Sequence, residues 1–354
     1  MRSVSPLADP LSSAAAAAPA FPLAVPKERR AQYGPAGDTL RRILHSKSAL
    51  VGGALVLLIV LLALLAPLIS PYDPIQANQR SSLEPPSSAH PMGADRFGRD
   101  VLSRVLWGGR WSLPVGFVSV GIAAICGVTL GLLAGYYGGT VDALIMRFVD
   151  LLLAFPSILL ALAIIAVLGG SLFNVMIAVG IAAIPEYVRV TRGTVLSVKE
   201  REYVLAARLV GCRDQLVLVR HILPNVGAPL IVLATLGMAS AIITGSALSF
   251  LGLGIRPPIP EWGNMLADGR EFLQRGWWIA CFPGLAIMLT VLSINLLGDG
   301  LRDALDPRLR QWRLACRARS SPEEVAALAA FLAGDEASFI TGAAYLVDGG
   351  YTAQ

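Results

Sequence analysis

The sequence predicts an all-α membrane protein in which six transmembrane helices form one bundle. The 354-residue chain has only 15% charged residues, against about 25% in soluble domains, and a mean hydropathy of +0.64. Five long windows contain no Asp, Glu, Lys or Arg, and each can supply the roughly 20 apolar residues that cross a bilayer. Runs such as 49–68 and 279–297 are apolar on nearly every side, whereas a core helix of a soluble protein keeps one polar face.

Each charge-free window predicts one span, except the window 151–185, which is too long for one. Gly169-Gly170-Ser171 offers a break within it, so we expect two spans there. The predicted spans, in order, are 49–70, 113–136, 144–168, 172–190, 225–252 and 278–298.

Two sequence features concern the second predicted span. Ahead of it, the apolar residues of 99–107 recur at helical spacing and predict an amphipathic helix at the membrane interface. Inside it, Gly127, Gly131 and Gly135 recur every fourth residue. That spacing favours close packing of two helices over a hinge.

Basic residues indicate the orientation, because they concentrate in the cytoplasmic loops of membrane proteins. Segment 27–48 holds six, the loop 186–220 seven and segment 299–319 six, whereas 256–275 holds three that as many acidic residues match. With six spans, the first three segments share one side, so we expect both termini to be cytoplasmic. The five arginines of 73–110 fit less well, since that segment then lies outside. The net charge of +5 is thus explained by topology, and we expect no nucleic acid partner.

Other features predict no chemistry on this chain. Residues 1–35 are rich in Ala, Pro and Ser without the pattern of a cleaved signal, and we expect a disordered cytoplasmic tail. The four cysteines lack the spacing of a metal site, so we expect packing residues, no metal and no cofactor. We expect no catalytic residue either. Asp150 has two interpretations, a functional charge within the membrane or an interfacial ion pair with Arg147. Its position one turn from Arg147 near a span end favours the ion pair.

The loop between the fourth and fifth spans carries the most informative pattern. Residues 198–210 are rich in helix formers, with the small residues Ala206 and Ala207 side by side. Gly211 can adopt the left-handed conformation that ends a helix, and we expect a second short helix at about 213–221, before Pro224. The pattern predicts a helix–glycine–helix elbow, which either connects two spans or also presents a rigid surface to a soluble partner.

A family resemblance favours the partner surface. Ala206-Ala207, Gly211 and, after nine intervening residues, the run 221–224 (His-Ile-Leu-Pro) resemble the signature loop of ABC-importer permeases. In that family the loop docks on the ATP-binding subunit, and the resemblance implies that residues 200–221 do so here. The resemblance implies coupling roles for Tyr203, Ala206, Ala207, Gly211, His221 and Pro224. The family often has Glu before the two alanines, and here Leu205 departs from that pattern.

Further motifs narrow the resemblance to one branch. Residues 92–104, Met-Gly-Ala-Asp-Arg-Phe-Gly-Arg-Asp-Val-Leu-Ser-Arg, resemble a segment of the dipeptide, oligopeptide and nickel permeases. Segments 147–156 and 250–263 are similar to the same branch. The similarity spans about residues 40–312 and is greatest for the second of the two permeases in such systems, the C subunit.

The resemblance implies partners and a mechanism. Such importers combine two permeases in the inner membrane with two ATP-binding subunits and a periplasmic binding protein. They work by alternating access. We therefore expect a heterodimer with a second permease subunit, embedded in the lipid bilayer. The sequence has no Gly-x-x-x-x-Gly-Lys-Ser/Thr phosphate loop, as expected for a permease whose ATPase is a separate chain. The resemblance favours dipeptides and oligopeptides as cargo, and it leaves glutathione, nickel complexes and some sugars open. The residues lining the path of the cargo stay unknown.

An ion-coupled secondary transporter is the alternative hypothesis. Transporters of that class bind their ions at unwound helices near the membrane midplane. In this sequence, ionisable residues such as Asp150 and Glu186 lie near the ends of the predicted spans. Their positions favour the ABC permease.

Residues 314–354 do not continue the permease pattern. Ser321, Pro322 and Glu324 predict a capped helix at about 322–333. This helix and the segment 345–351 resemble the C-terminal end of short-chain dehydrogenases/reductases. Those enzymes need a glycine-rich nucleotide loop and a Tyr-x-x-x-Lys pair, and neither occurs in the sequence. We expect no oxidoreductase activity, interpret the tail as a fused or frameshifted gene end, and expect the permease domain at 36–313.

Overall fold

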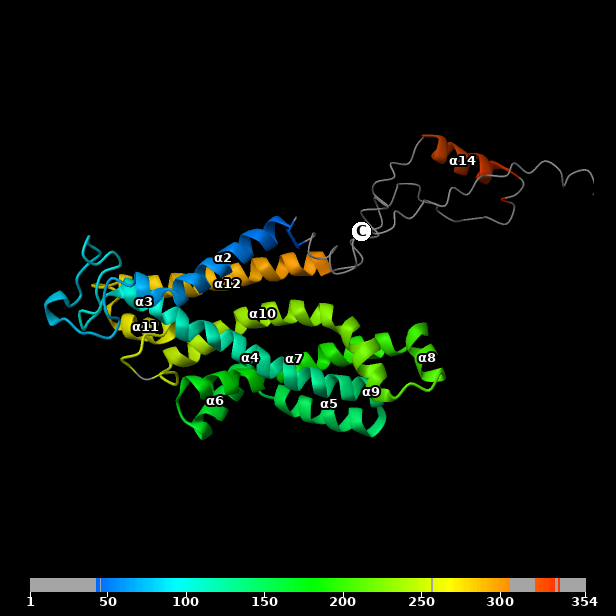
Figure 1. Ribbon diagram of the computed structural model, residues 1–354, viewed down its shortest axis with the longest axis horizontal. Helices are drawn as coiled ribbons and strands as arrows, with labels where there is room; N and C mark the ends of the chain where they lie inside the picture. The colour runs from blue at the N-terminus through cyan, green and yellow to red at the C-terminus, as the bar shows by residue number, and fades with distance from the viewer. Residues whose placement is uncertain (1–42, 45, 256, 306–321, 335–336, 338–354) are drawn as a thin grey trace, which may run out of the picture. The chain divides into compact units, whose positions relative to one another are not determined.

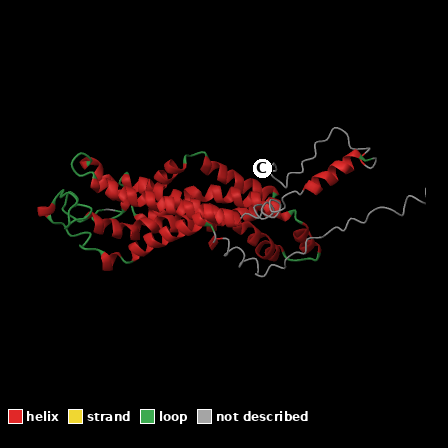
Figure 2. Ribbon diagram, turned by 90° about the horizontal axis from the view of Figure 1, so that it is seen from above, coloured by secondary structure: helices red, strands yellow, loops and turns green. Residues whose placement is uncertain are grey.

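The computed structural model describes residues 43–44, 46–255, 257–305, 322–334 and 337. Within these residues all regular elements are helices, apart from one isolated bridge between Ala94 and Asp100 (Figure 2). Five helices are long and apolar enough to cross a membrane, and a bent helix pair makes a sixth candidate if it counts as one span. The prediction of an all-α membrane protein is confirmed. The tail predicted at 1–35 lies outside the described residues.

Figure 1 gives the order of the elements. They are α2 (Lys47–Leu64), α3 (Ala66–Ile69), η2 (Gln79–Ser81), α4 (Val101–Tyr137), α5 (Gly139–Leu153), α6 (Ser157–Leu168), α7 (Leu172–Lys199), α8 (Glu202–Leu209), α9 (Asp214–Val217), η3 (Leu218–Ile222), α10 (Leu223–Phe250), α11 (Trp262–Gly269), η4 (Arg270–Phe272), α12 (Trp278–Leu305) and α14 (Pro322–Ala333). The helix predicted at 322–333 is α14, whereas its predicted capping residue, Ser321, and residues 338–354 lie outside the described part of the chain.

Helix α4 is one continuous helix of 37 residues. Asp100 caps its start by accepting a hydrogen bond from the backbone amide of Ser103 at 2.8 Å. The helix predicted at 99–107 is present, but it is the first part of α4 and not an interfacial helix, because its residues Val101 and Val105 pack in a cluster with Trp262 and Trp278. Even Arg104 is only 3% exposed, so these turns lie inside protein and not on a membrane surface.

The glycine repeat of α4 allows close contact with α7. A Cβ atom added at Gly131 would lie 2.6 Å from the Cβ of Thr191, and one at Gly135 would lie 2.8 Å from the Cβ of Val195. Gly127 has the same relationship to Tyr187. The residue numbers rise together on both helices, so α4 and α7 run in the same direction. The predicted close packing is therefore present, with α7 as the partner of α4.

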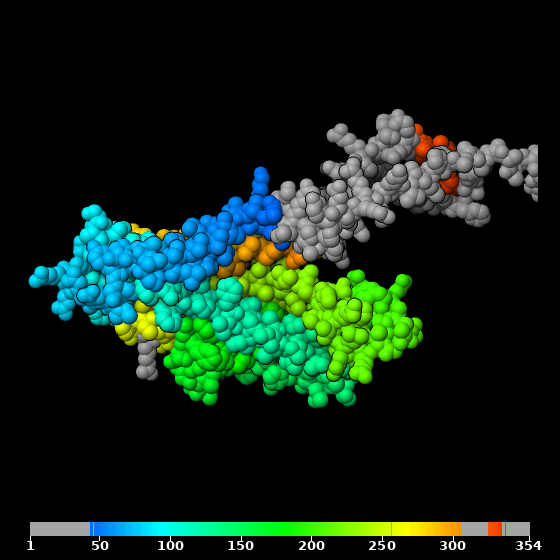
Figure 3. Space-filling view, viewed as in Figure 1, coloured from blue at the N-terminus to red at the C-terminus, as the bar shows by residue number. Residues whose placement is uncertain are grey.

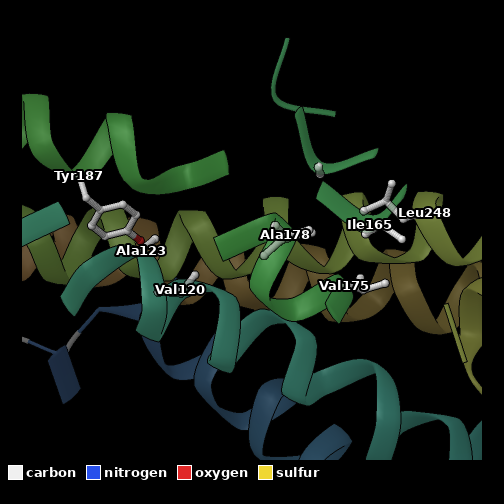
Figure 4. Packing of buried hydrophobic residues seen from close by; sticks show 10 residues of the cluster. Val120, Ala123, Ile165, Val175, Ala178, Tyr187 and Leu248 are labelled. Atoms are coloured by element: carbon white, nitrogen blue, oxygen red, sulfur yellow. The ribbon is translucent and has the colours of Figure 1, made fainter. Parts of the chain in front are cut away.

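The main apolar core lies where α4, α6, α7 and α10 meet (Figure 4). Val120 and Ala123 come from α4, Val175 and Tyr187 from α7, and Leu248 from α10. Tyr187 is 1% exposed although it carries a hydroxyl group, which donates to the carbonyl oxygen of Leu233 at 3.4 Å. This core fixes the three long helices relative to one another.

The third predicted span is bent. α5 and α6 meet at 89°, at a break of three residues that ends in Pro156. Proline cannot donate the backbone hydrogen bond that would continue α5, and it disfavours helical geometry at the residue before it. Gly169, at φ +87°, then ends α6, and Ser171 caps α7 by accepting from the amide of Asn174 at 3.1 Å. The break predicted at 169–171 is confirmed.

Buried ion pairs hold the segment between α3 and α4. Asp95 Oδ2 lies 2.6 Å from Arg99 Nε and 3.6 Å from Arg104 Nε, and all three side chains are at most 4% exposed. Arg99 also reaches Asp268, at 3.7 Å, and Arg96 reaches the same carboxylate at 3.5 Å. Two of the arginines that fitted the charge rule poorly, Arg99 and Arg104, are thus paired inside protein, whereas Arg96 remains exposed. Charges paired inside protein carry little information about which side of a membrane their loop occupies.

Candidate coupling site

Residues 200–224, here called the elbow, contain all six of the residues to which the resemblance gave coupling roles. α8, α9 and η3 form the elbow. In the helix bundle it lies at the end opposite α3 and α11 (Figure 1). Its atoms, green to yellow-green, project at that end in the space-filling view (Figure 3). The elbow is therefore placed to meet a partner outside the bundle.

The first helix of the elbow, α8, has one inward and one outward side. α7 runs nine residues past its predicted end at 190 and stops at Lys199, and α8 begins at Glu202. Val204 points inward and is fully buried. Tyr203 and Ala206 are exposed, and Ala207 is half-buried. Ala206 thus leaves a low surface on the outer side of α8, whereas Ala207 lies toward its inner side.

Gly211 ends α8 in the way the sequence predicts. Its φ of +83° is left-handed. The Gly211 amide donates to the carbonyl oxygen of Arg208 at 2.9 Å, and the Cys212 amide donates to that of Ala207 at 3.1 Å. This pair of bonds is the Schellman motif. A Cβ at this position would meet no atom within 4 Å, so the backbone conformation and not space requires glycine here.

The second helix of the elbow is not a separate unit. We predicted a short helix at about 213–221, whereas α9, η3 and α10 continue one another from Asp214 to Phe250. η3 is a π-helical turn in which the Leu223 amide reaches back to Leu218. Pro224 has no amide proton and would crowd the carbonyl four residues earlier. The wider turn relieves that conflict, and the side chain of Asn225 donates to the carbonyl oxygen of His221 at 2.7 Å.

The structure brings some of the predicted site residues together and leaves others apart. The rings of Tyr203 and His221 lie 6.5 Å apart between centroids, so the start of α8 faces η3. Ala207 and Gly211 share the turn that ends α8. Pro224 is exposed at the start of α10, and Ala206 faces outward.

An apolar cluster ties the elbow to three long helices. Its buried members are Tyr136 from α4, Val195 and Val198 from α7, Val204 from α8, Val217 from α9, Leu218 and Ile222 from η3, and Val226 from α10. Ala207 and Cys212 pack against the cluster. A displacement of the elbow would therefore move the adjoining ends of α4, α7 and α10 with it.

A polar contact strengthens the same connection, and the sequence did not predict it. The hydroxyl group of Tyr136 donates to Asp214 Oδ1 at 2.6 Å, and the guanidinium group of Arg208 lies 4.6 Å from the centre of the Tyr136 ring. Lys199 Nζ also donates to the carbonyl oxygen of Gly135 at 3.0 Å. Tyr136 ends the predicted second span, but nothing in its spacing points to a partner 78 residues later.

The outer side of the elbow exposes large apolar side chains. Leu209 and Val210 are 88% and 85% exposed. They lie between two basic residues, Arg208 and Arg213. The exposed large hydrophobic residues of the elbow are Tyr203, Leu205, Leu209, Val210, Leu216 and Val219. Exposed apolar groups rimmed by polar residues mark sites that contact another protein or a membrane. The site can therefore accept a protein partner on its outer side while the cluster holds its inner side.

Family models match most of the chain. Residues 127–311 match the family described as binding-protein-dependent transport system inner membrane component. Residues 34–86 match the N-terminal transmembrane domain of oligopeptide transport permease C. Residues 297–352 match a family described as enoyl-(acyl carrier protein) reductase, so this third match includes the end of α12 and the tail.

Curated relatives match the same region over nearly their whole length. The dipeptide transport system permease protein DppC of Alkalihalophilus pseudofirmus is 46% identical over 285 residues, which are 80% of this chain and 94% of the relative. The di/tripeptide transport system permease protein DppC of Pseudomonas aeruginosa is 50% identical over 75% of this chain and 90% of its own. The glutathione transport system permease protein GsiD of Pectobacterium atrosepticum is 48% identical over 76% and 90%.

Proposed function

This chain belongs to the family of binding-protein-dependent transport system inner membrane components, and we propose that it forms half of the translocation pathway of an importer for dipeptides and oligopeptides. It is a permease subunit of an ABC transporter, in which ATP is hydrolysed on a separate subunit. The observation that carries the peptide assignment is 46–50% identity to permeases named for dipeptides and di/tripeptides. The relative named for glutathione supports it, because glutathione is itself a modified tripeptide.

The elbow is the contact for the ATP-binding subunits in this proposal. Ala206 leaves room for a close approach, Tyr203 and the exposed Leu209 supply apolar surface, and the turn at Gly211 keeps the surface rigid. His221 and Pro224 link this surface to α10 through η3. The apolar cluster below the elbow supports the assignment, since it gives movement of the partner a direct route into α4, α7 and α10.

The proposed assembly has four kinds of subunit. A second permease completes the pathway, two ATP-binding subunits occupy the cytoplasmic side and a periplasmic binding protein delivers the peptide. Closure of the ATP-binding subunits moves the elbows and opens the pathway outward, and hydrolysis resets it. The chain spans the inner membrane with both termini and the elbow in the cytoplasm. The basic residues of 27–48 and 299–319 support this orientation, as do those of the predicted loop 186–220 from Lys199 onward.

The working domain in this proposal is 36–313. The matches to permease families begin at residue 34 and end at 311, which supports these bounds. Residues 1–35 form a cytoplasmic tail. Residues 314–354 are a fused or frameshifted fragment, and the separate family match of the tail supports that assignment.

Uptake into reconstituted vesicles tests the proposal. The full chain is co-expressed with the permease, ATPase and binding protein encoded beside it, and the complex is placed in liposomes with a labelled dipeptide. We expect uptake that needs ATP and the binding protein and that stops with vanadate. Uptake driven by a proton or sodium gradient without ATP would instead establish the ion-coupled alternative.

A further inference from the structure

Helix α7 carries a polar stripe on the side that faces away from the bundle. Glu186, Arg189, Gly193 and Ser197 are all exposed, and their spacing of three, four and four residues puts them on one face of the helix. The opposite face packs against α4, where Thr191 is fully buried. Beyond Phe173, the exposed large hydrophobic residues of the chain include none from α7.

A helix face that meets lipid looks different in this protein. α2 exposes Leu57, Leu58 and Leu61, among other large apolar residues, on its outer side. That surface suits hydrocarbon, in which a charged side chain is costly. The polar stripe of α7 does not suit hydrocarbon, so in the assembled transporter it meets either water or protein.

An ion pair extends the stripe onto α5. Asp150 Oδ1 lies 2.9 Å from Arg189 Nη2, and both side chains are more than half exposed. The predicted interfacial pair of Asp150 with Arg147 is therefore wrong. Residue 147 lies on the side of α5 that faces away from α7, whereas Asp150 lies on the flank next to α7.

The Asp150–Arg189 pair lies inside the depth of the bundle and not at its end. Gly131 of α4 packs against Val188 and Thr191, which flank Arg189 on α7. α4 ends at Tyr137, six residues after Gly131, which is roughly 9 Å along the helix axis. Tyr137, which is half-exposed at the end of α4, is of a residue type typical of the membrane–water interface, and this places the pair within the membrane, on the elbow side of its midplane.

We propose that the stripe lines the aqueous translocation pathway and that Asp150 and Arg189 form a transient binding station for the charged termini of the peptide. The inference rests on the proposed peptide cargo. A peptide zwitterion has one ammonium group, which Asp150 can accept, and one carboxylate group, which Arg189 can hold by a charge-assisted hydrogen bond. Small residues at 193 and 197 leave room for it on the elbow side of the station.

The existing ion pair keeps such binding weak, as transport requires. The peptide must replace the 2.9 Å contact between Asp150 and Arg189, so each new bond is formed at the expense of one already present. A path that holds its cargo only briefly allows both entry and release. The bend between α5 and α6, which begins four residues after Asp150, gives the station a wall that can shift during the transport cycle.

Thiol labelling tests whether the stripe meets water. Gly193→Cys and Ser197→Cys are made in a chain whose four native cysteines are replaced, and the assembled complex in inverted vesicles is treated with a charged, membrane-impermeant thiosulfonate. A side chain at residue 193 meets no atom within 4 Å, so the variant should fold. We expect both cysteines to react, with slower reaction when vanadate traps the nucleotide-bound state. Leu57→Cys, on the apolar side of α2, should stay unreactive.

If Gly193→Cys did not react with the thiosulfonate, with or without vanadate, the pathway assignment would be overturned. The stripe would then lie in lipid or in a permanent protein interface. This readout does not depend on the cargo. A negative result would therefore leave the proposed importer function intact, and a failure of peptide uptake would not affect the labelling.

Transport assays test the binding station. We expect Asp150→Asn and Arg189→Gln each to lower dipeptide uptake about tenfold, the loss associated with one charge-assisted hydrogen bond. ATP hydrolysis stimulated by the loaded binding protein should stay within about twofold of the unmodified complex. Unchanged uptake in the double variant would overturn the station.

The second ion pair between α5 and α7 provides the matched control. Asp142 is paired with Arg192, and these side chains are only 20% and 30% exposed. Asp142→Asn should lower the melting temperature of the complex while uptake per folded complex stays unchanged. If Asp142→Asn and Asp150→Asn had the same effect on uptake per folded complex, both pairs would be structural and the station would be rejected.

Discussion

Tyr136 donates a hydrogen bond to Asp214 at 2.6 Å and so joins the end of α4 to the first turn of α9. Arg208 of α8 lies over the same tyrosine ring, 4.6 Å from its centre. Both helices of the elbow therefore hold one residue of a long helix that runs through the bundle. The apolar cluster alone could slide, because its contacts are not directional. A hydrogen bond to one oxygen atom fixes the angle between elbow and helix.

The first prediction removes only that hydrogen bond. Tyr136→Phe keeps the ring on which Arg208 lies and loses the hydroxyl group that Asp214 accepts. We expect the peptide transported per ATP hydrolysed to fall roughly two- to tenfold, which corresponds to the net value of one hydrogen bond. Reconstituted vesicles give both rates. The control is Tyr137→Phe at the neighbouring, half-exposed tyrosine; an equal loss there would show that the Asp214 bond has no special role.

The second prediction uses two glycines with the same geometry. Gly211 and Gly252 both have φ +83°, both end a helix with the same two backbone hydrogen bonds, and neither has an atom within 4 Å of an added Cβ. We expect alanine at either position to destabilise the protein equally, by about 1–2 kcal/mol for the left-handed backbone. Thermal unfolding in detergent measures this.

Substitution by tryptophan should have different effects on coupling at the two glycines. Gly211→Trp projects a ring from the elbow surface proposed to dock the ATP-binding subunits, so we expect loss of coupling between hydrolysis and uptake and poor recovery of those subunits on purification. Gly252→Trp should retain them, because Gly252 follows the other end of α10. Normal transport by Gly211→Trp would remove the elbow from the docking surface.

The third prediction concerns the contact between α4 and α7. Gly127→Ala would place a methyl group against the Cβ of Tyr187 and the carbonyl oxygen of Ile184, where backbone must move to admit it. We expect a loss of about 1–3 kcal/mol, the usual cost of overpacking. The matched control is Gly121→Ala, six residues earlier on the same helix, where an added Cβ meets no atom within 4 Å. It should be neutral or stabilising, since alanine favours helix. Equal melting temperatures would mean that α4 and α7 are not in close contact.

The sequence allowed the prediction of features that depend on composition or on local backbone chemistry. Charge-free windows locate the long helices because hydrocarbon excludes charge. Gly211 ends α8 and Gly169 ends α6, because glycine tolerates the positive φ that both adopt. The family of the chain also followed from local motifs in the elbow and in residues 92–104.

Features that depend on contacts between distant segments could not be predicted in the same way. The pairing of Asp150 with Arg189 spans 39 residues, so the local rule chose Arg147 instead. The first turns of α4 have the pattern of an interfacial helix, but two tryptophans, Trp262 and Trp278, cover the apolar side. The continuity of α9 with α10 depends on a π-helical turn at Leu218–Ile222, which no propensity marks.

The fourth prediction concerns the tail. A stop codon after Arg313 removes 314–354 and leaves α12, which ends at Leu305, complete. The permease family match ends at residue 311, so we expect the truncated chain to assemble with its partners and to transport at the unmodified rate. Uptake in a strain that carries only the truncated gene measures this. Loss of assembly would give the tail a structural role and would extend the working domain beyond 313.

The last prediction tests the buried ion pairs between α3 and α4. Asp95→Asn keeps the Oδ1 acceptor that receives the amides of Phe97 and Arg99, but it removes the charge that faces Arg99 and Arg104. The side chains of both arginines are at most 4% exposed. Arg99 keeps its contact with Asp268, whereas Arg104 loses its ion pair, and a buried charge left without its partner costs about 3–5 kcal/mol. We expect a marked drop in melting temperature that added salt does not reproduce in the unmodified protein, because ions do not reach buried pairs. Asp73→Asn is the control: Asp73 is exposed and caps its turn through Oδ1 alone, so its charge should be dispensable. If both variants had the same melting temperature, Asp95 would act only as a hydrogen-bond acceptor.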